Sequence, residues 1–403
     1  MSSLEHLFSS QSQWIKGSPI DEFMSKQQIT REDMIYLSVG TPGKECIPLK
    51  ELQHVSHQLY NQSSIDFLDY GDSTGNEQLR QWIMQHHAKE GMYILPEELM
   101  ITSGSTQGFD LCCKSFLNKG DAVIMENPTY SNNFSTVQSY GANIYSVPVD
   151  ENGMMINLLE QTIETIIAAG ETLKMVCVIP HAQNPSGVTL SLERKVRLLE
   201  LSEKYDFLII EDDPYSETMF DEKIPSMFSM DDDHRHVIYL NSFSKMIAPG
   251  LRVGYALGNQ QFINKLVQYK QLNDSCSSSF SQQVIVDFFN EYSFSNHLSF
   301  IQQQYQRKKD VMIASLEKYF RHSDVRWTNP KGGLFLWVTM PNIDTTKLLL
   351  YAIEEGILYI PGVAFQSNNG NNHHLRLCYS YCEEEKIDEA ISRLFHAYNA
   401  YPN

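Results

Sequence analysis

Lys245 lies in the stretch SFSKMIAPGLRVG, residues 242–254, among small and apolar neighbours, and Arg252 follows in the same stretch. A desolvated lysine beside another cation has a lowered pKa, because its ammonium form is disfavoured. The neutral amine can then attack a carbonyl carbon and form a Schiff base. Ser242, Ser244 and Arg252 would hold a phosphate group, the arginine through its planar fork of N–H donors. The alternative is an ordinary surface lysine, so the pattern needs support from the rest of the chain.

Polar residues follow other short apolar runs in the same way. Ser105 and Thr106 open a helical stretch in ITSGSTQGFDLCCKSF, where free backbone N–H groups and the helix dipole favour an anion. Tyr130 comes shortly after the run AVIM and can stack on a planar ligand. Asn184, in AQNPSG, would bring an amide to the end of a strand. Each residue also has an ordinary explanation, namely a helix N-cap, a packing aromatic and a turn asparagine.

Two adjacent acids, Asp212 and Asp213, end the apolar run FLIIE, and Tyr215 follows them. A carboxylate at the end of a buried strand is costly unless a cation or a hydrogen-bond donor meets it. A protonated ring nitrogen would be such a partner. The other interpretation is a pair of solvated loop acids.

The elements that must position these residues alternate between two patterns. Amphipathic stretches such as residues 191–205 separate several short runs rich in apolar residues, at 122–125, 143–147, 174–179, 207–211, 237–241 and 252–257. Strands that alternate with helices predict a parallel sheet covered by helices on both faces. Such sheets bind ligands at the carboxyl ends of their strands, so the polar residues above are expected to meet there.

The pattern changes after about residue 258. It is helical to about residue 320, and the runs 331–338 and 374–380 then predict strands, with helices around 344–355 and 383–398. We therefore expect a second, smaller α/β unit. The predicted division is an N-terminal segment 1–45 that packs with the small domain, a large domain 46–300 and a small domain 301–403.

Composition argues against several classes of protein. The net charge is −18 and no basic stripe stands out, which argues against binding to nucleic acid or to an anionic membrane. The seven cysteines show no CxxC motif and no metal-like spacing, so we expect a reducing cytoplasm and no metal site. The N-terminus lacks an apolar signal core, and no apolar run approaches the length of a membrane span.

Taken in order, these motifs resemble the fold-type I aminotransferases that use pyridoxal 5'-phosphate. The resemblance runs from about residue 14 to 395, and the closest subgroup is the 2-aminoadipate/kynurenine aminotransferase-like enzymes, which resemble this chain in SPI, YGDSTG, GSTQG and EDDPY. It implies a large domain with a mostly parallel seven-stranded sheet between helices, and a smaller α/β domain. It also implies an enzyme that moves an amino group from an L-amino acid to a 2-oxo acid such as 2-oxoglutarate.

The resemblance assigns a role to each residue. Lys245 carries the cofactor and moves a proton, while Asp212 pairs with the pyridine nitrogen; we prefer Asp212 to Asp213 because it lies three residues before Tyr215. Tyr215 and Asn184 donate to the phenolic oxygen, and Tyr130 stacks on the ring. The phosphate is held by Ser105, Thr106, Ser242, Ser244 and Arg252.

Three further residues are assigned by the same resemblance. Arg376, in HLRLCYS, matches the arginine that binds the substrate α-carboxylate, and Asn184 lies near the substrate as well. Gly40, in LSVGTPG, matches a backbone position beside the substrate. Tyr70, in LDYGDSTG, matches a tyrosine that reaches the phosphate of the neighbouring subunit. The implied assembly is a homodimer with shared active sites.

One departure bears on specificity. Relatives that accept acidic side chains often have an arginine directly after SPI, where this chain has Asp21. An aspartate there would repel a distal carboxylate, so neutral, aromatic or basic side chains are expected. Two alternatives stay open at this point: a β-eliminating lyase that uses the same residues, and a non-catalytic ligand-sensing domain like those fused to DNA-binding segments.

Overall fold

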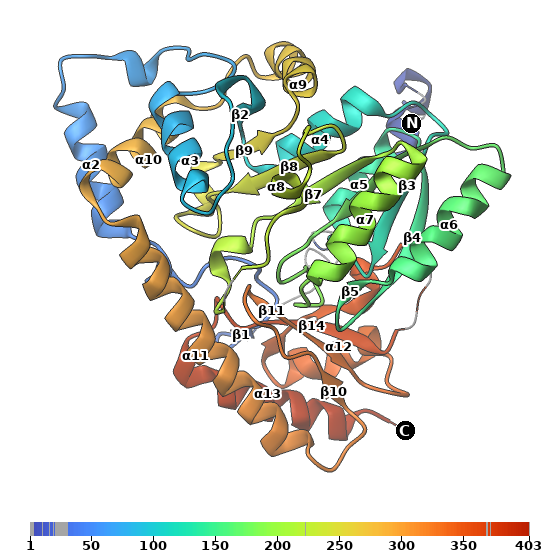
Figure 1. Ribbon diagram of the computed structural model, residues 1–403. Coiled ribbons are helices and arrows are strands. Elements are labelled where there is room, and N and C mark those ends of the chain that lie inside the picture. Colours follow the sequence, from blue (N-terminus) through green and yellow to red (C-terminus); the bar gives the residue numbers. More distant parts are fainter. Residues whose placement is uncertain are drawn as a thin grey trace.

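The computed structural model describes residues 4–9, 11–15, 17–18, 20, 31–221, 223–367, 370 and 372–402. A large sheet between helices lies above a smaller sheet with its own helices (Figure 1). This arrangement confirms the predicted α/β architecture with a large, mostly parallel sheet. The predicted division at residues 45 and 300 stays a prediction, and the long helix α11 (Phe294–Phe320) runs across residue 300.

The large sheet has eight strands among the described residues, one more than expected. Their spatial order is β2 (Leu99–Thr102), β9 (Gly254–Leu257), β8 (Val237–Ser242), β7 (Leu208–Asp212), β6 (Leu173–Val178), β3 (Ala122–Asn127), β4 (Asn143–Asp150) and β5 (Gly153–Met154). The strands from β8 to β4 are parallel. The additional strand β5 has only two residues and folds back on β4 through a tight turn, so no apolar run announced it.

Strand β9 runs in a direction that the sequence pattern did not indicate. It pairs antiparallel with β8 on one side and with β2 on the other. Between β8 and β9 the chain forms only short turns, the last of which is the 3-10 helix η7 (Pro249–Leu251). A parallel pair needs a long crossover connection, so this short link can only turn the chain back.

Helices cover both faces of the large sheet, as the nearly all-apolar strands predicted. Val176 and Val178 of β6 face a core shared with α3, α6, α7 and α10, whereas Met175 and Cys177 face one shared with α4, α5 and α9. The helices around this sheet are α2 (Leu49–Tyr60), α3 (Glu77–Ala88), α4 (Ser105–Phe116), α5 (Ser131–Ser139), α6 (Ile156–Ala168), α7 (Leu192–Tyr205), α8 (Met227–Met230), α9 (Gln260–Asn273) and α10 (Ser279–Glu291).

The smaller sheet is antiparallel and packs on α11, α12 and α13. Its order is β10 (Arg326–Trp327), β11 (Phe335–Thr339), β14 (His374–Cys378) and β13 (Ile360–Pro361). Helices α12 (Thr345–Glu354) and α13 (Glu384–Ala400) share one apolar core with α11 and this sheet. This part therefore has its own core, as expected for a second α/β unit.

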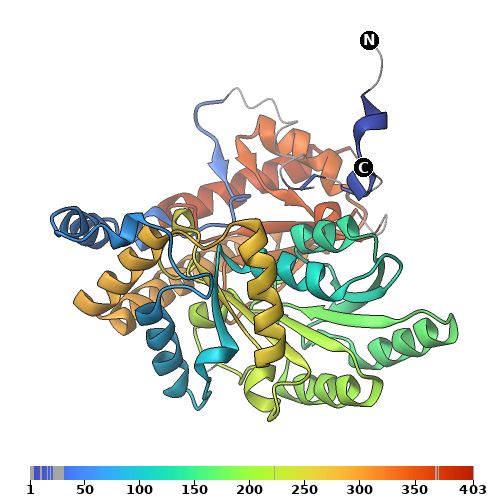
Figure 2. The same ribbon diagram turned by 90° about the horizontal axis from the view of Figure 1, so that it is seen from above.

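The N-terminal part of the chain contacts the smaller sheet. Strand β1 (Ile35–Tyr36) pairs with β12 (Ile357–Leu358), and the carbonyl of Leu37 accepts from the Cys378 amide at 2.8 Å. The first described turn, η1 (Glu5–Leu7), projects from the body of the molecule (Figure 2). Among the described helices, none has the length and apolar character that crossing a bilayer requires.

Candidate active site

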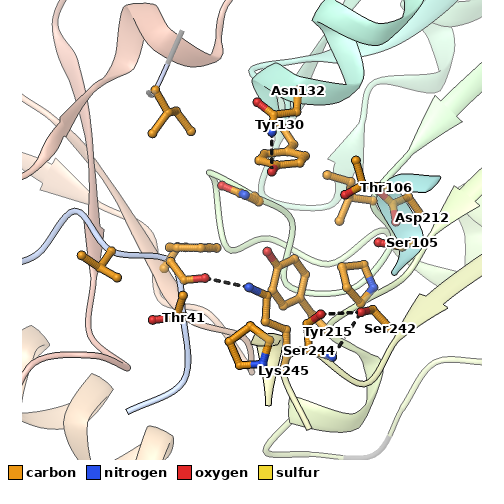
Figure 3. A pocket seen from close by; sticks show the side chains of 18 of the residues that line it. Thr41, Ser105, Thr106, Tyr130, Asn132, Asp212, Tyr215, Ser242, Ser244 and Lys245 are labelled. Atoms are coloured by element: carbon orange, nitrogen blue, oxygen red, sulfur yellow. Dashed lines mark hydrogen bonds between the residues drawn. The ribbon is translucent and has the colours of Figure 1, made fainter. Parts of the chain in front are cut away.

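A cavity of about 530 Å³ lies at the carboxyl ends of β6, β7 and β8 (Figure 3). The structure brings all the predicted site residues except Tyr70 to its walls: Gly40, Ser105, Thr106, Tyr130, Asn184, Asp212, Tyr215, Ser242, Ser244, Lys245, Arg252 and Arg376. They come from both sheets and from the segment before α2. The strand-end rule thus predicted the place where residues far apart in sequence meet.

One end of the cavity is built for an anion. Helix α4 begins at Ser105, directly after Gly104, so its free N–H groups point toward this end. Ser242 Oγ and Ser244 Oγ lie 2.8 Å apart, and Arg252 Nη1 donates to Ser244 Oγ at 3.2 Å. A helix N-terminus, two hydroxyls and a guanidinium are suited to a phosphate group.

Gly104 allows Arg252 to approach α4. Its φ is +84° and its ψ is 165°, a region that is essentially restricted to glycine. A Cβ atom at this position would lie 2.4 Å from Arg252 Nη2. The same Nη2 donates to the carbonyl of Ser103 at 3.1 Å. The guanidinium is therefore fixed against the backbone that leads into α4.

Lys245 follows β8 and reaches the middle of the cavity. Its Nζ donates to the carbonyl of Gly40 at 2.7 Å, the contact drawn beside it in Figure 3. Burial lowers the pKa of Lys245 to about 8; Cys378 acts in the opposite direction, and the positive charges of Arg376 and Arg252 make smaller contributions that lower it further. The neutral amine that a nucleophile requires is thus much easier to reach than for an ordinary lysine.

Asp212 and Asp213 point to different sides of β7. Asp212 lines the cavity; its Oδ2 accepts from Asn133 Nδ2 at 2.8 Å, and its Oδ1 has no hydrogen-bond partner among the described residues. Burial raises the pKa of Asp212 to about 6. A buried carboxylate with a free oxygen needs a cation or a donor. A protonated ring nitrogen in the cavity would supply one.

Asp213 has its partners elsewhere. Its Oδ2 accepts from His181 Nδ1 at 3.0 Å on the side away from the cavity. Burial acts to raise the pKa of Asp213, but the positive charges of His181, Lys195 and Lys223 lower it overall. Of the two acids, only Asp212 is available to a ligand in the cavity.

Arg376 enters the cavity from β14 as a buried cation. Its Nη1 donates to Asn184 Oδ1 at 2.9 Å and its Nη2 to the carbonyl of Ser38 at 2.8 Å. The guanidinium lies 4.2 Å from the centre of the Phe335 ring, and its Nε has no partner in the described part of the chain. A buried guanidinium with only neutral partners is costly, and a bidentate carboxylate would relieve this cost.

The two tyrosines that line the cavity come from two loops. Tyr130 precedes α5 and its hydroxyl accepts from Asn132 Nδ2 at 2.9 Å. Tyr215 follows β7, is buried and packs edge-on against Phe335. Both hydroxyl groups and rings face the space between Lys245 and Asn132 (Figure 3). Stacking and donation to a planar oxygen-bearing ring are the tasks that such side chains can perform.

The sequence did not indicate the role of some residues of the site. Asn133, the partner of Asp212, lies three residues after Tyr130 on the first turn of α5, so a correctly placed helix start would have indicated it. Ile20 and Ser38 line the cavity and lie in SPI and LSVGTPG, but neither was assigned a role there, and Phe335 lines it from the predicted strand 331–338. Asp21 lies outside the described residues.

Tyr70 lies apart from this cavity. It is 86% exposed and borders a different hollow beside α3 and α10, with Gly71 and Asp72. In the described part of its own protomer, Tyr70 does not line this cavity. This position is compatible with a role in a second copy of the chain.

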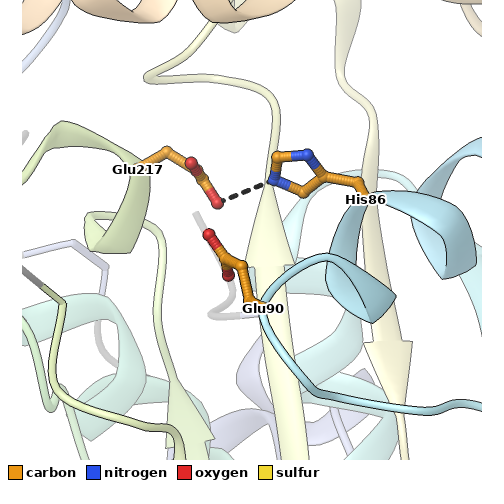
Figure 4. A group of neighbouring side chains, drawn as sticks. All are labelled: His86, Glu90 and Glu217. Atoms are coloured by element: carbon orange, nitrogen blue, oxygen red, sulfur yellow. Dashed lines mark hydrogen bonds and ion pairs between the residues drawn. The ribbon is translucent and has the colours of Figure 1, made fainter.

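A separate group of ionisable side chains lies near the far end of α3. His86, Glu90 and Glu217 hold their ligand atoms within 4.8 Å of one another (Figure 4). Lys223 Nζ donates to Glu217 at 2.8 Å and also pairs with Glu90, while His86 Nε2 contacts Glu217 at 3.1 Å. The lysine ammonium pairs with both carboxylates, so an ion-pair network accounts for the group.

The cavity fits pyridoxal 5'-phosphate. The anion end suits its phosphate, the free Asp212 Oδ1 suits its ring nitrogen, and the amine of Lys245 lies in the same cavity for the aldehyde. Tyr130 offers its ring, and Arg376 adds a carboxylate site on the side of the smaller sheet.

Comparisons with known proteins agree with this geometry. The sequence profile of the family "Aminotransferase class I and II" matches residues 32–394. Aromatic-amino-acid aminotransferase 1 of Thermococcus litoralis is 34% identical over 97% of this chain and 93% of its own length.

Two solved structures are also similar along the whole chain. The kynurenine aminotransferase of Pyrococcus horikoshii, in complex with PMP, has a TM-score of 0.92 and 33% identity, covering 100% of this chain and 99% of that one. LysN, the alpha-aminoadipate aminotransferase of Thermus thermophilus, complexed with N-(5'-phosphopyridoxyl)-L-leucine, has a TM-score of 0.90 and 30% identity, covering 99% and 98%. This chain belongs to the class I and II aminotransferases and is a fold-type I enzyme that uses pyridoxal 5'-phosphate to transfer an amino group from an amino acid.

Proposed function

We propose that the enzyme takes the amino group of an L-amino acid with a neutral, aromatic or basic side chain and passes it to a 2-oxo acid such as 2-oxoglutarate. The proposal rests on the cations that line the described cavity, because each of them already has a proposed partner. Lys245, Arg252 and Arg376 are required for the aldehyde, the phosphate and the α-carboxylate, respectively. No further lining cation in the described part of the chain is left for a distal carboxylate, whereas Ile20, Ile179 and Phe335 offer apolar contact.

A comparison of donors tests the substrate class. Phenylalanine, leucine, lysine and 2-aminoadipate are each mixed with the cofactor-loaded enzyme without an acceptor, and the conversion of the cofactor to its amine form is followed by absorbance. We expect the first three to react and 2-aminoadipate to react weakly. Strong, selective reaction with 2-aminoadipate would contradict the proposal. Return of the original spectrum with release of ammonia would indicate the β-eliminating reaction instead.

We assign the following roles to the residues of the cavity. The bound cofactor supplies an electron sink for the negative charge that develops at the substrate Cα. Lys245 Nζ removes the Cα proton as a general base and returns a proton as a general acid. Asp212 keeps the ring nitrogen protonated through its free oxygen. Arg376 clamps the α-carboxylate, which fixes the Cα–H bond relative to Lys245 and contributes by positioning.

We also infer a homodimer with shared active sites. Tyr70 lies outside the cavity of its own protomer, and the neighbouring stretch of chain exposes further large apolar side chains, Tyr60, Ile65 and Leu68. Exposed apolar side chains of this kind support a protein interface. In such a dimer Tyr70 would reach the phosphate end of the partner's cavity. The seven cysteines, all free thiols, support a reducing compartment such as the cytoplasm.

A further inference from the structure

A buried amide lies directly behind the turn that carries Asn184 into the cavity. Gln183 is 1% exposed and does not line the cavity. Its Nε2 donates to Glu126 Oε2 at 3.1 Å and to the carbonyl of Pro128 at 2.6 Å. Its Oε1 accepts from the amide of Ser186 at 2.9 Å and from Ser186 Oγ at 2.6 Å. These four hydrogen bonds use the full capacity of a carboxamide, so only glutamine chemistry satisfies this position.

The backbone of Gln183 closes the same turn. Its amide donates to the carbonyl of Val188 at 2.8 Å, and its carbonyl accepts from the amide of Gly187 at 2.6 Å. Gly187 has a φ of +72°, and a Cβ atom there would lie 2.6 Å from the carbonyl of Phe335. The turn is therefore pressed against β11, the strand whose Phe335 ring lies under the Arg376 guanidinium.

Glu126 ties the turn to the neighbouring strand. It is buried near the end of β3, which pairs with β6, and its Oε2 accepts from the amide of Ile179 at 3.0 Å as well as from Gln183. Burial raises the pKa of Glu126 to about 8, so its carboxyl is largely protonated at neutral pH. It therefore acts as a neutral anchor between β3 and the exit of β6, and adds little charge near Asp212.

We propose that Gln183 is a positioning residue of this enzyme: anchored to Glu126 and Pro128, it holds Asn184 Oδ1 against the guanidinium of Arg376. The contact that it maintains is 2.9 Å long. Gln183 touches neither the cofactor nor the substrate, so it acts only through Asn184. This inference rests on the proposed roles of Asn184 at the cofactor oxygen and Arg376 at the substrate carboxylate.

The test compares Gln183→Leu with the wild-type enzyme, both loaded with cofactor. Leucine fills most of the volume and removes all four side-chain hydrogen bonds. The probe is 3-phenylpropanoate, a carboxylate without an amino group, whose binding is measured by calorimetry. We expect its Kd to rise at least about tenfold, while the cofactor content per subunit stays at the wild-type value because the contacts of Lys245 and the anion end remain. The midpoint pH of the visible absorbance of the bound cofactor should also shift, because Asn184 no longer donates in a fixed direction.

Gln302→Leu is the matched control. Gln302 lies on α11 and donates from Nε2 to the carbonyl of Glu217 at 3.0 Å, outside the cavity. Gln302→Leu also removes a side-chain amide that joins two parts of the chain, so it measures the general effect of losing such an amide on folding and binding. We expect its Kd for 3-phenylpropanoate and its absorbance midpoint to equal those of the wild type.

Two milder variants keep the test decisive if Gln183→Leu does not fold. Glu126→Gln retains an acceptor oxygen for both contacts and should behave as the wild type, whereas Ser186→Ala removes one donor to Gln183 and should raise the Kd about two- to fivefold. A Gln183→Leu enzyme, or in its place a Ser186→Ala enzyme, that binds the probe and titrates like the wild type would overturn the positioning role alone. A wild-type protein that binds no cofactor would instead overturn the proposed function on which it rests.

Discussion

Lys245 is proposed to bind the cofactor covalently, and its ionisation would then decide whether the bond can form. Burial, with smaller contributions from the charges of Arg376 and Arg252, lowers the pKa of Lys245 to about 8 from the 10.5 of an ordinary lysine. Only the neutral amine attacks an aldehyde, and its fraction rises with pH until the pKa is passed. We expect the rate of pyridoxal 5'-phosphate uptake by cofactor-free protein to rise about tenfold per pH unit below 8 and to level off above it. Stopped-flow absorbance measures this rate, and a rate that keeps climbing to about pH 10 would indicate an unshifted lysine.

Substitution of Arg376 is expected to change substrate binding and to leave cofactor binding unchanged. Its guanidinium has two neutral oxygen acceptors and a free Nε among the described residues, so a substrate carboxylate gains a bidentate, charge-assisted contact. Arg376→Lys keeps the charge and loses the fork, which should weaken amino-acid binding by roughly 1.5–3 kcal/mol, about tenfold to a hundredfold in Kd.

The measurement for Arg376→Lys is the concentration dependence of the half-reaction with phenylalanine, together with the cofactor content. The control is Arg307→Lys, an exposed arginine on α11 that pairs with Glu384. Equal substrate affinity in Arg376→Lys and in the control would show that the arginine is not the carboxylate site.

Gly104 comes directly before α4, and we expect its substitution by alanine to have a much larger effect than the same substitution at Gly250. Gly104→Ala puts a Cβ atom 2.4 Å from Arg252 Nη2 at a φ of +84°. The backbone strain should cost roughly 1–3 kcal/mol of unfolding free energy, and the displaced guanidinium should weaken cofactor binding. Gly250→Ala is the control, because a Cβ atom there meets nothing within 4 Å. Thermal unfolding and cofactor titration check both variants, and a Gly104→Ala protein that matches Gly250→Ala in both would contradict the predicted geometry.

At the scale of secondary structure, the sequence predicted which segments form strands better than it predicted the directions in which the strands run. The apolar runs predicted β3, β6, β7 and β8, because strands covered on both faces leave a clear signal, and the run 143–147 also predicted the partly exposed β4. The reversed direction of β9 depends on the absence of a crossover helix after β8, and β5 has two residues only. The residue types of these segments indicate neither the direction of β9 nor the presence of β5.

The same limit applies to the site. Lys245, Asp212 and Arg252 follow strands or turns with distinctive polar residues, and the structure brings them to one cavity. Ser38 contributes a backbone carbonyl, and Phe335 and Gln183 act through packing and an amide network, so their contributions depend on the folded chain rather than on a motif.

The arrangement of the molecule as a whole predicts that one protomer completes the site of another. Tyr70 is 86% exposed and outside its own cavity. Lys245→Ala alone should be inactive, and Tyr70→Ala alone should bind cofactor about tenfold more weakly, by roughly one lost charge-assisted hydrogen bond. When the two variants are produced together, a mixed dimer has one site with both lesions and one intact site.

Mixed dimers can be isolated with two different affinity tags. At limiting cofactor they should have roughly half of the wild-type activity per dimer, because one of their two sites is intact. The control is a mixture of the two variants purified separately and assayed at once. Recovery no greater than the sum of the separate variants would argue that Tyr70 acts within its own protomer or not at all.

The most direct test is to reduce the cofactor-loaded protein with borohydride and to locate the pyridoxyl group by mass spectrometry of its peptides. We expect a single modified side chain, Lys245, in the peptide that contains SFSKMIAPGLR. Modification of another lysine, or of none, would contradict this expectation, even though the other residues of the cavity are in place.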